Sequence, residues 1–121
     1  RRAVELAGAD AEGVLASNPG LPLDAMPGGA AFKAKFEAKY GRIQNYAPYA
    51  YDALYVLVEA MKRAQSNDPA KYLAELPKTD YQGVTGHIRF DARGDLAGGA
   101  VTLYQVKDGR WQALETVRSG N

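Results

Sequence analysis

The sequence predicts a fold that mixes α-helices and β-strands, and three observations support this prediction. Residues 48–64 carry apolar side chains at the spacing of a helix that is covered on most sides. After residue 84 the hydrophobic period changes to two, as in a strand with one packed face. Finally, Asp108 and Gly109 separate two apolar runs in the manner of a tight β-hairpin.

The first 29 residues contain short elements and a long loop. Residues 1–6 are typical of a helix end, which the following Ala7-Gly8 pair terminates because glycine accepts the left-handed backbone conformation. Residues 13–17 are short and apolar enough for a buried strand. Prolines and glycines interrupt residues 18–29 repeatedly, so we expect a loop there.

Residues 29–40 are predicted to form an outer helix with one apolar side. Phe32, Phe36 and Tyr40 follow one another at four-residue steps, and charged residues lie elsewhere around the helix, namely Lys33, Lys35, Glu37 and Lys39. Gly41 is expected to end this helix.

Residues 48–64 form the most apolar predicted helix of the chain. Pro48 fits its first turn, where the missing N–H would have no helical partner. The spacing predicts a core face, widened at its edges, made of Ala50, Ala53, Leu54, Leu57, Met61, Tyr51, Tyr55 and Val58. The side chains expected to meet water are Asp52, Glu59, Lys62 and Arg63, with Glu59 and Arg63 spaced to pair.

A short helix and a strand are predicted next. Asp68 caps a helix that starts at Pro69 and is closed by Pro77. Residues 84–90 then alternate, which puts Val84, Gly86, Ile88 and Phe90 on a packed face and Thr85, His87 and Arg89 toward water. The only histidine of the chain is therefore expected on the exposed side.

The last element is a predicted hairpin of residues 101–107 and 110–117. An Asp-Gly pair suits a two-residue turn because both positions need positive φ. Counting outward from the turn pairs Val106 with Trp111 and Tyr104 with Ala113 on one face. This register predicts a packing role for Trp111.

Composition limits the possible classes of protein. With 121 residues the chain is long enough for one domain with a core, and its 46% hydrophobic and 24% charged residues are ordinary for a globular protein. Its net charge of +1 gives no indication of nucleic acid as a partner. The absence of cysteine excludes disulfides and thiolate sites. There is no apolar run of about 18 residues and no signal-peptide core at the start.

The sequence predicts no catalytic residues, no metal site and no cofactor site. No serine lies in a nucleophile-elbow setting, and Arg89 and Arg93 place positive charge where a cation at His87 would sit. Residues 91–95 suggest a calcium loop only superficially, because Arg93 stands where an oxygen ligand is needed. A turn between strands is the better interpretation, and no phosphate-binding loop is present.

Tyr46 immediately precedes the 48–64 helix, which allows two interpretations. Unpaired N–H groups and the positive end of the helix dipole could form a ligand corner there. Alternatively, Tyr46, Tyr49, Tyr51 and Tyr55 pack at the edge of the core with their hydroxyls in solvent, and the spacing alone favours this second interpretation.

Two sequence blocks carry a family resemblance. They are Tyr-Ala-Pro-Tyr-Ala-Tyr-Asp-Ala at residues 46–53 and Thr-Gly-His-Ile-Arg-Phe-Asp-Ala-Arg-Gly-Asp at residues 85–95. With Leu6-Ala7-Gly8, Glu12-Gly13-Val14 and the Phe-x-x-Lys-Phe helix before them, nearly the whole chain resembles the C-terminal third of a periplasmic branched-chain amino-acid binding protein. Such proteins are the substrate-binding components of ABC importers and have a type I periplasmic binding fold.

The resemblance implies a bilobal α/β protein whose lobes are mostly parallel sheets flanked by helices, with a C-terminal β-hairpin. Residues 1–17 would end one lobe, 18–29 would form the crossing loop, 30–99 the second lobe and 100–121 the hairpin. It also implies that a missing N-terminal part carries the secretion signal and most of the ligand site. The protein would be periplasmic, with an ABC permease in the membrane as a partner.

The resemblance further implies that Tyr46 packs on the ligand side chain, where reference members have phenylalanine. Tyr49 is a second ligand-binding candidate, from its proximity to Tyr46 alone. The ligand would be a branched-chain or related amino acid, or an amide. The alternative function is a ligand-sensing domain of a receptor or regulator, which uses the same fold.

Overall fold

A computed structural model describes residues 2–44 and 46–119, and the chain divides into two compact units. One unit combines Arg1–Pro22 with Gly98–Asn121, and the other consists of Leu23–Ala97. The chain passes into the second unit within the region expected to be a crossing loop. Each unit has its own small core.

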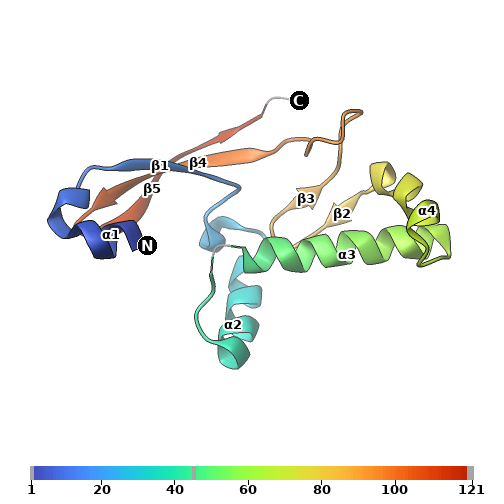
Figure 1. Ribbon diagram of the computed structural model, residues 1–121, viewed down its shortest axis with the longest axis horizontal. Helices are drawn as coiled ribbons and strands as arrows, with labels where there is room; N and C mark the ends of the chain where they lie inside the picture. The colour runs from blue at the N-terminus through green and yellow to red at the C-terminus, as the bar shows by residue number, and fades with distance from the viewer. Residues whose placement is uncertain (1, 45, 120–121) are drawn as a thin grey trace. The chain divides into compact units, whose positions relative to one another are not determined.

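The elements of both units are labelled in Figure 1, where η denotes a 3₁₀-helix. In chain order they are α1 (Arg2–Ala7), η1 (Gly8–Ala11), β1 (Leu15–Pro19), η2 (Leu23–Ala25), α2 (Gly29–Tyr40), α3 (Ala47–Ala64), α4 (Pro69–Tyr72), η3 (Leu73–Lys78), β2 (Tyr81–Gln82), β3 (His87–Ile88), β4 (Ala100–Lys107) and β5 (Arg110–Arg118). None of the described helices is long and apolar enough to cross a membrane.

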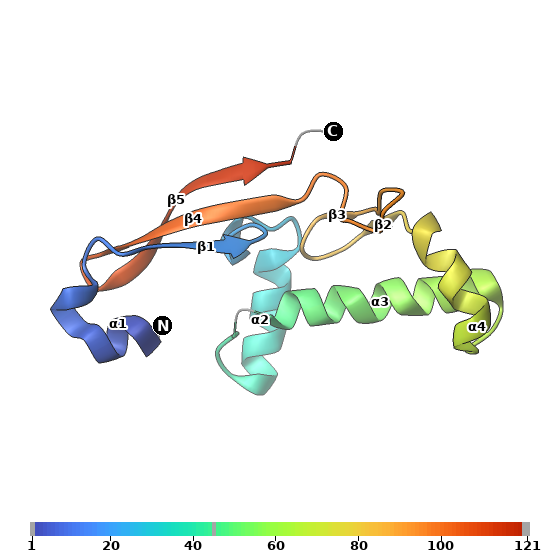
Figure 2. The same cartoon turned by 45° about the horizontal axis from the view of Figure 1, so that its top comes forward.

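The first unit contains a three-stranded antiparallel sheet in which β4 lies between β1 and β5 (Figure 2). The β4–β5 hairpin confirms the predicted register, with Val106 opposite Trp111 and Tyr104 opposite Ala113. Asp108 and Gly109 have φ values of 51° and 69°, as the two-residue turn requires. The Glu12 carboxylate accepts hydrogen bonds from both turn N–H groups, at 3.1 and 3.3 Å.

Two predictions for the sheet need correction. The first strand covers Leu15–Pro19 rather than residues 13–17, and it is exposed, since Leu15 retains 62% of its accessible surface. An edge strand pairs on one side only, so its apolar residues are not buried by the sheet itself. The α/β class and the C-terminal hairpin are confirmed, but every described strand pair is antiparallel. Parallel neighbours need long crossover connections, whereas a two-residue turn joins β4 to β5.

The core of the first unit includes a polar residue on β4. Thr102 is fully buried beside Val106, and Ala11 is also buried. The Thr102 hydroxyl donates to the Gly20 carbonyl at 2.7 Å and lies 2.9 Å from the Thr116 hydroxyl. These bonds replace the water that the hydroxyl loses on burial.

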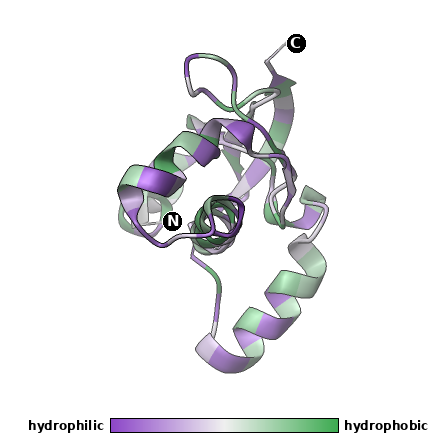
Figure 3. Ribbon diagram, turned by 90° about the vertical axis from the view of Figure 1, so that its right-hand side faces the viewer, coloured by the Kyte–Doolittle hydropathy of each residue, from purple (hydrophilic) through white to green (hydrophobic). Residues whose placement is uncertain are grey.

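In the second unit, the predicted helices α2 and α3 are both confirmed. Along α2, hydrophilic and hydrophobic residues follow one another, as Figure 3 shows by colour. The helix ends at Gly41, which has a φ of 75°. At its start, Gly29 lies so close to the Leu23 carbonyl that a Cβ would come within 1.9 Å of the oxygen.

The buried face of α3 differs from the prediction. Its buried residues are Pro48, Asp52, Val56 and Ala60, which follow one another at four-residue steps. Asp52, expected in water, is only 2% exposed, whereas Leu54, expected in the core, is 59% exposed. Tyr51 and Tyr55 are also exposed in part. The helix is therefore turned so that a carboxylate faces the interior of this unit.

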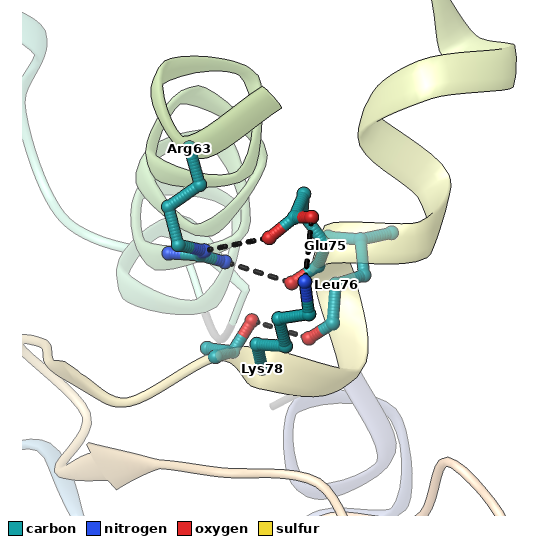
Figure 4. Close-up of polar contacts among 5 residues, drawn as sticks. Arg63, Glu75, Leu76 and Lys78 are labelled. Atoms are coloured by element: carbon teal, nitrogen blue, oxygen red, sulfur yellow. Dashed lines mark hydrogen bonds and ion pairs between the residues drawn. The ribbon is translucent and has the colours of Figure 1, made fainter. Parts of the chain in front are cut away.

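At its C-terminal end, α3 is joined to η3 by a polar cluster around Glu75 (Figure 4). The Arg63 Nη2 donates to the Glu75 carbonyl at 2.9 Å, and the Lys78 Nζ lies 2.7 Å from the Glu75 carboxylate. Arg63 thus pairs with Glu75 rather than with Glu59, which contacts Lys62 instead.

The chain after α3 departs from the prediction at one proline. As predicted, the Asp68 side chain caps the short helix, by accepting from the Ala70 N–H at 3.0 Å. Helical turns nevertheless continue past Pro77 to the end of η3, because a proline is compatible with a short 3₁₀ segment that lacks one N–H donor. The Thr79 hydroxyl then donates to the Leu76 carbonyl at 2.6 Å where this segment ends.

The predicted strand of residues 84–90 is shorter in the structure. Only His87–Ile88 forms a strand, paired with β2, and a single bridge joins Phe90 to Leu96. His87 is exposed, as predicted. The turn expected at residues 91–95 is confirmed, since the Asp91 carboxylate accepts N–H bonds within it.

Candidate functional site

The N-terminal end of α3 holds the two tyrosines singled out as ligand-binding candidates. Tyr46 is the N-cap residue, and its side chain lies largely in solvent, since the residue is 75% exposed. Tyr49 lies in the first turn and is half-buried. An exposed aromatic side chain can present an apolar surface to a small molecule.

The backbone at this helix end offers less to an anion than the sequence suggested. The Ala47 N–H donates to the Gln44 carbonyl at 3.3 Å, and Pro48 has no N–H. The Ala50 N–H donates to the Tyr46 carbonyl at 2.9 Å and so begins the helical pattern. The aromatic side chains, rather than a set of unpaired N–H groups, are therefore the features of this end that suit a ligand.

A series of aromatic rings connects α2, α3 and β2 within the same unit. The ring centroids of Phe32 and Tyr51 are 5.2 Å apart, those of Tyr51 and Tyr55 are 4.8 Å apart, and those of Tyr55 and Tyr81 are 6.3 Å apart. A hydrogen bond between the Tyr51 and Tyr55 hydroxyls raises the pKa of Tyr51. These contacts confirm that Tyr51 and Tyr55 pack at the edge of the helix, with part of each side chain in solvent.

Asp52 fastens α3 to the turn that follows β2. Its carboxylate accepts hydrogen bonds from the Val84 N–H at 2.9 Å, the Thr85 N–H at 2.8 Å and the Thr85 hydroxyl at 2.6 Å. Charge-assisted bonds of this kind are the stronger ones in proteins, and they compensate the carboxylate for lost water. No buried side-chain N or O atom among the described residues lacks a partner.

Two glycines allow this close packing. A Cβ on Gly83 would come within 2.5 Å of the Asp52 carboxylate, and a Cβ on Gly28 would come within 2.9 Å of the Val84 Cα. The Gly28 N–H also donates to the Val84 carbonyl at 3.0 Å. We call Gly28, Asp52, Gly83, Val84 and Thr85 the Asp52 junction, which joins three segments of the second unit.

The Asp52 junction was not predicted from the sequence, because Asp52 was expected among the solvent-facing residues. A signal was nevertheless present, since Pro48, Val56 and Ala60 lie at four-residue spacing on both sides of Asp52. An acid within such a stripe, together with a later Gly-Val-Thr-Gly turn that needs acceptors for its N–H groups, indicates a buried carboxylate.

A second polar pair lies on the β2–β3 hairpin. The His87 Nε2 is 2.5 Å from the Asp80 Oδ1, and both side chains are substantially exposed. The hydrogen bond from the His87 ring holds the pKa of Asp80 below its ordinary value; desolvation opposes this shift, and the charges of His87 and Arg89 support it.

We predict that His87→Ala raises the pKa of Asp80 toward its ordinary value. Because the folded-state pKa of Asp80 is depressed, the stabilising effect is present above the unfolded value of about 3.9 and is lost as the pH falls through the folded pKa. Carboxyl ¹³C NMR titration measures the change. Lys62→Ala is the control, because that charge does not act on Asp80, and an equal Asp80 titration in wild type and His87→Ala would contradict the prediction.

Among the described residues, no group of three or more His, Cys, Asp or Glu side chains is arranged to hold a metal ion. His87 has one carboxylate contact, to Asp80, with Arg89 near that pair. The two candidate tyrosines, Tyr46 and Tyr49, lie at the start of α3, and Asp52 lies further along the same helix.

Comparison of the sequence with known proteins identifies the family of this chain. Residues 1–110, which include all of α3 and every labelled element before β5, match the periplasmic binding protein family. The chain belongs to this family. A 75-residue stretch is also 32% identical to the leucine-, isoleucine-, valine-, threonine- and alanine-binding protein of Pseudomonas aeruginosa, covering 62% of the present chain and 19% of that protein.

Solved structures of similar proteins agree. A leucine-binding protein, LivK, from Thermotoga maritima is 29% identical and superposes over 96% of the chain with a TM-score of 0.81. An ABC transporter substrate-binding protein from Desulfitobacterium hafniense, in complex with leucine, is 35% identical and superposes over 86% with a TM-score of 0.72. The chain spans 34% of the first structure and 32% of the second. The family and the fold are thus those of substrate-binding proteins.

Proposed function

We propose that this chain is the C-terminal part of a periplasmic solute-binding protein that delivers a branched-chain amino acid, or a related amino acid or amide, to an ABC importer. The observation that carries the proposal is the match to a leucine-binding protein over 96% of the chain, together with the family match over residues 1–110. Such a protein acts by binding and release and performs no bond chemistry.

In this proposal the ligand binds between the two lobes of the whole solute-binding protein. The present chain contributes some of the residues that contact the ligand. Tyr46 packs on the ligand side chain, and Tyr49 supports it from the first turn of α3. The exposure of Tyr46 supports this role, because a mostly exposed aromatic side chain is accessible to a ligand. A tyrosine at this position adds a hydroxyl that a polar ligand could use.

The remaining part of the polypeptide supplies the groups for the ligand's charged ends and the other part of each lobe. Exposed apolar side chains on the described units fit this arrangement, because Leu54 on α3 and Leu15 on β1 would then be covered by further segments. The two compact units of the chain correspond in this proposal to parts of the two lobes, and the chain crosses between them near residue 22 and again near residue 98. A permease in the membrane receives the ligand from the closed form.

Native mass spectrometry of the full-length protein that contains this chain tests the proposal. Leucine, isoleucine, valine, phenylalanine and small amides are added singly, with an acidic amino acid as the negative control. We expect a mass increase of one ligand for at least one branched-chain amino acid or amide and none for the acidic one. A protein that retains none of the panel would overturn the proposed ligand class.

A further inference from the structure

We infer that Asp52 is a positioning residue for the ligand-binding end of α3, which it holds in place through the Asp52 junction. The inference rests on the proposed function for the identity of the ligand. The placement of Asp52 itself follows from the hydrogen bonds and packing of the described residues.

The Asp52 carboxylate makes three hydrogen bonds. It accepts from two backbone N–H groups and one hydroxyl, all on the adjacent residues Val84 and Thr85. A bidentate arrangement of this kind restricts both the distance and the rotation of the helix relative to the turn. Because Asp52 is only 2% exposed, water does not readily replace these donors.

The turn that carries Val84 and Thr85 is also attached to the start of α2. The Gly28 N–H donates to the Val84 carbonyl, so the turn is bonded to the residue that precedes α2. The contacts around Gly28 and Gly83 leave no space for even one additional methyl group. Close packing of this kind gives the junction a single arrangement rather than several. The Asp52 junction therefore sets the position of α3 against the start of α2.

Asp52 is connected to the two tyrosines through the first turns of α3. Asp52 lies one turn after Pro48 and Tyr49, at the i+4 and i+3 positions that share a helix face. Pro48 is fully buried on that face. The Tyr46 carbonyl is bonded to the Ala50 N–H, so the N-cap residue follows any movement of the first turn. A helix that shifts at Asp52 thus carries Tyr46 with it, and ligand contacts depend on such positioning.

Asp52→Asn is the first test, because the amide keeps the shape of the carboxylate. Its oxygen can still accept one N–H, but its NH₂ group faces a second N–H donor, which leaves that donor without a partner. With leucine as the probe and the full-length protein in a calorimeter, we expect the Kd to rise about tenfold. Val56→Ala is the control, since Val56 is buried one turn further along the same face and takes no part in the junction. It should lower the melting temperature and leave the Kd unchanged.

A second readout does not depend on the ligand. Fluorotyrosine placed at position 46 gives one ¹⁹F signal, which we expect to shift or broaden in Asp52→Asn and to remain in place in Val56→Ala. If Asp52→Asn does not fold, Thr85→Val removes only the hydroxyl bond of 2.6 Å and should shift the same signal by a smaller amount.

The outcomes separate the inference from the proposed function. If Tyr46→Ala weakens leucine binding while Asp52→Asn changes neither the Kd nor the ¹⁹F signal, the positioning role is overturned and the proposed function stands. If the wild-type protein binds no leucine but the ¹⁹F signal responds to Asp52→Asn and not to Val56→Ala, the proposed ligand is wrong and the positioning role stands. Equal effects of Asp52→Asn and Val56→Ala would show that Asp52 acts on stability alone.

Discussion

Asp52→Ala is expected to lower the free energy of unfolding by about 3 kcal/mol, because it leaves two backbone N–H groups and one hydroxyl, all partly buried, without their acceptor. The loss is larger than for an ordinary surface substitution, since the residue is almost fully buried. It also removes the carboxylate atoms that pack against Gly83, which has no side chain of its own to replace them. Urea denaturation, followed by circular dichroism of the protein that carries this chain, measures the effect.

Asp68→Ala provides a matched control for this substitution. Asp68 is exposed and accepts a single N–H bond, from Ala70, as the cap of α4. We expect its replacement to cost about 1 kcal/mol, as for other N-cap residues. If the two alanine variants were equally stable, the Asp52 carboxylate would contribute no more than a surface cap, and the account of the junction would be wrong.

The prediction from sequence succeeded where local chemistry determines the structure. Asp108 and Gly109 favour their turn by conformational preference, and counting from that turn gives the register of the hairpin as far as the Tyr104–Ala113 pair, where the register shifts. In the same way Gly41 ends α2, and Pro48 marks the start of α3. These features need no information about distant parts of the chain.

Burial was predicted less well because it depends on partners far away in the sequence. Periodicity alone gave α3 a wide apolar stripe and could not indicate which side of that stripe meets the rest of its unit. The three donors of Val84 and Thr85 lie more than thirty residues after Asp52 and settle the rotation of the helix. For the same reason the short first strand, judged by its apolar residues, was expected in a core, although it lies at the edge of its sheet.

The candidate site could be predicted only in part. Tyr46 was selected by a resemblance to a family, and the structure adds that its side chain is exposed at the start of α3. The junction that we infer to position it involves Gly28, Asp52 and Val84, which are widely separated along the chain. Such a set has no signature at a fixed spacing, since each residue contributes one contact to a shared packing arrangement.

Tyr46→Ala in the full-length protein is expected to weaken leucine binding by about 1–3 kcal/mol, as for the truncation of an aromatic side chain that packs on a partner. The fold should change little, because the Tyr46 side chain is mostly exposed and lies outside α3 itself, which begins at Ala47.

Tyr46→Phe is the matched control. It keeps the ring, so a ligand that uses only the aromatic surface should bind it almost as tightly as the wild type. A ligand that hydrogen-bonds to the hydroxyl should bind both variants weakly, and calorimetry with leucine and with a small amide separates these cases. If Tyr46→Ala binds every ligand of the wild type with unchanged affinity, Tyr46 does not belong to the site.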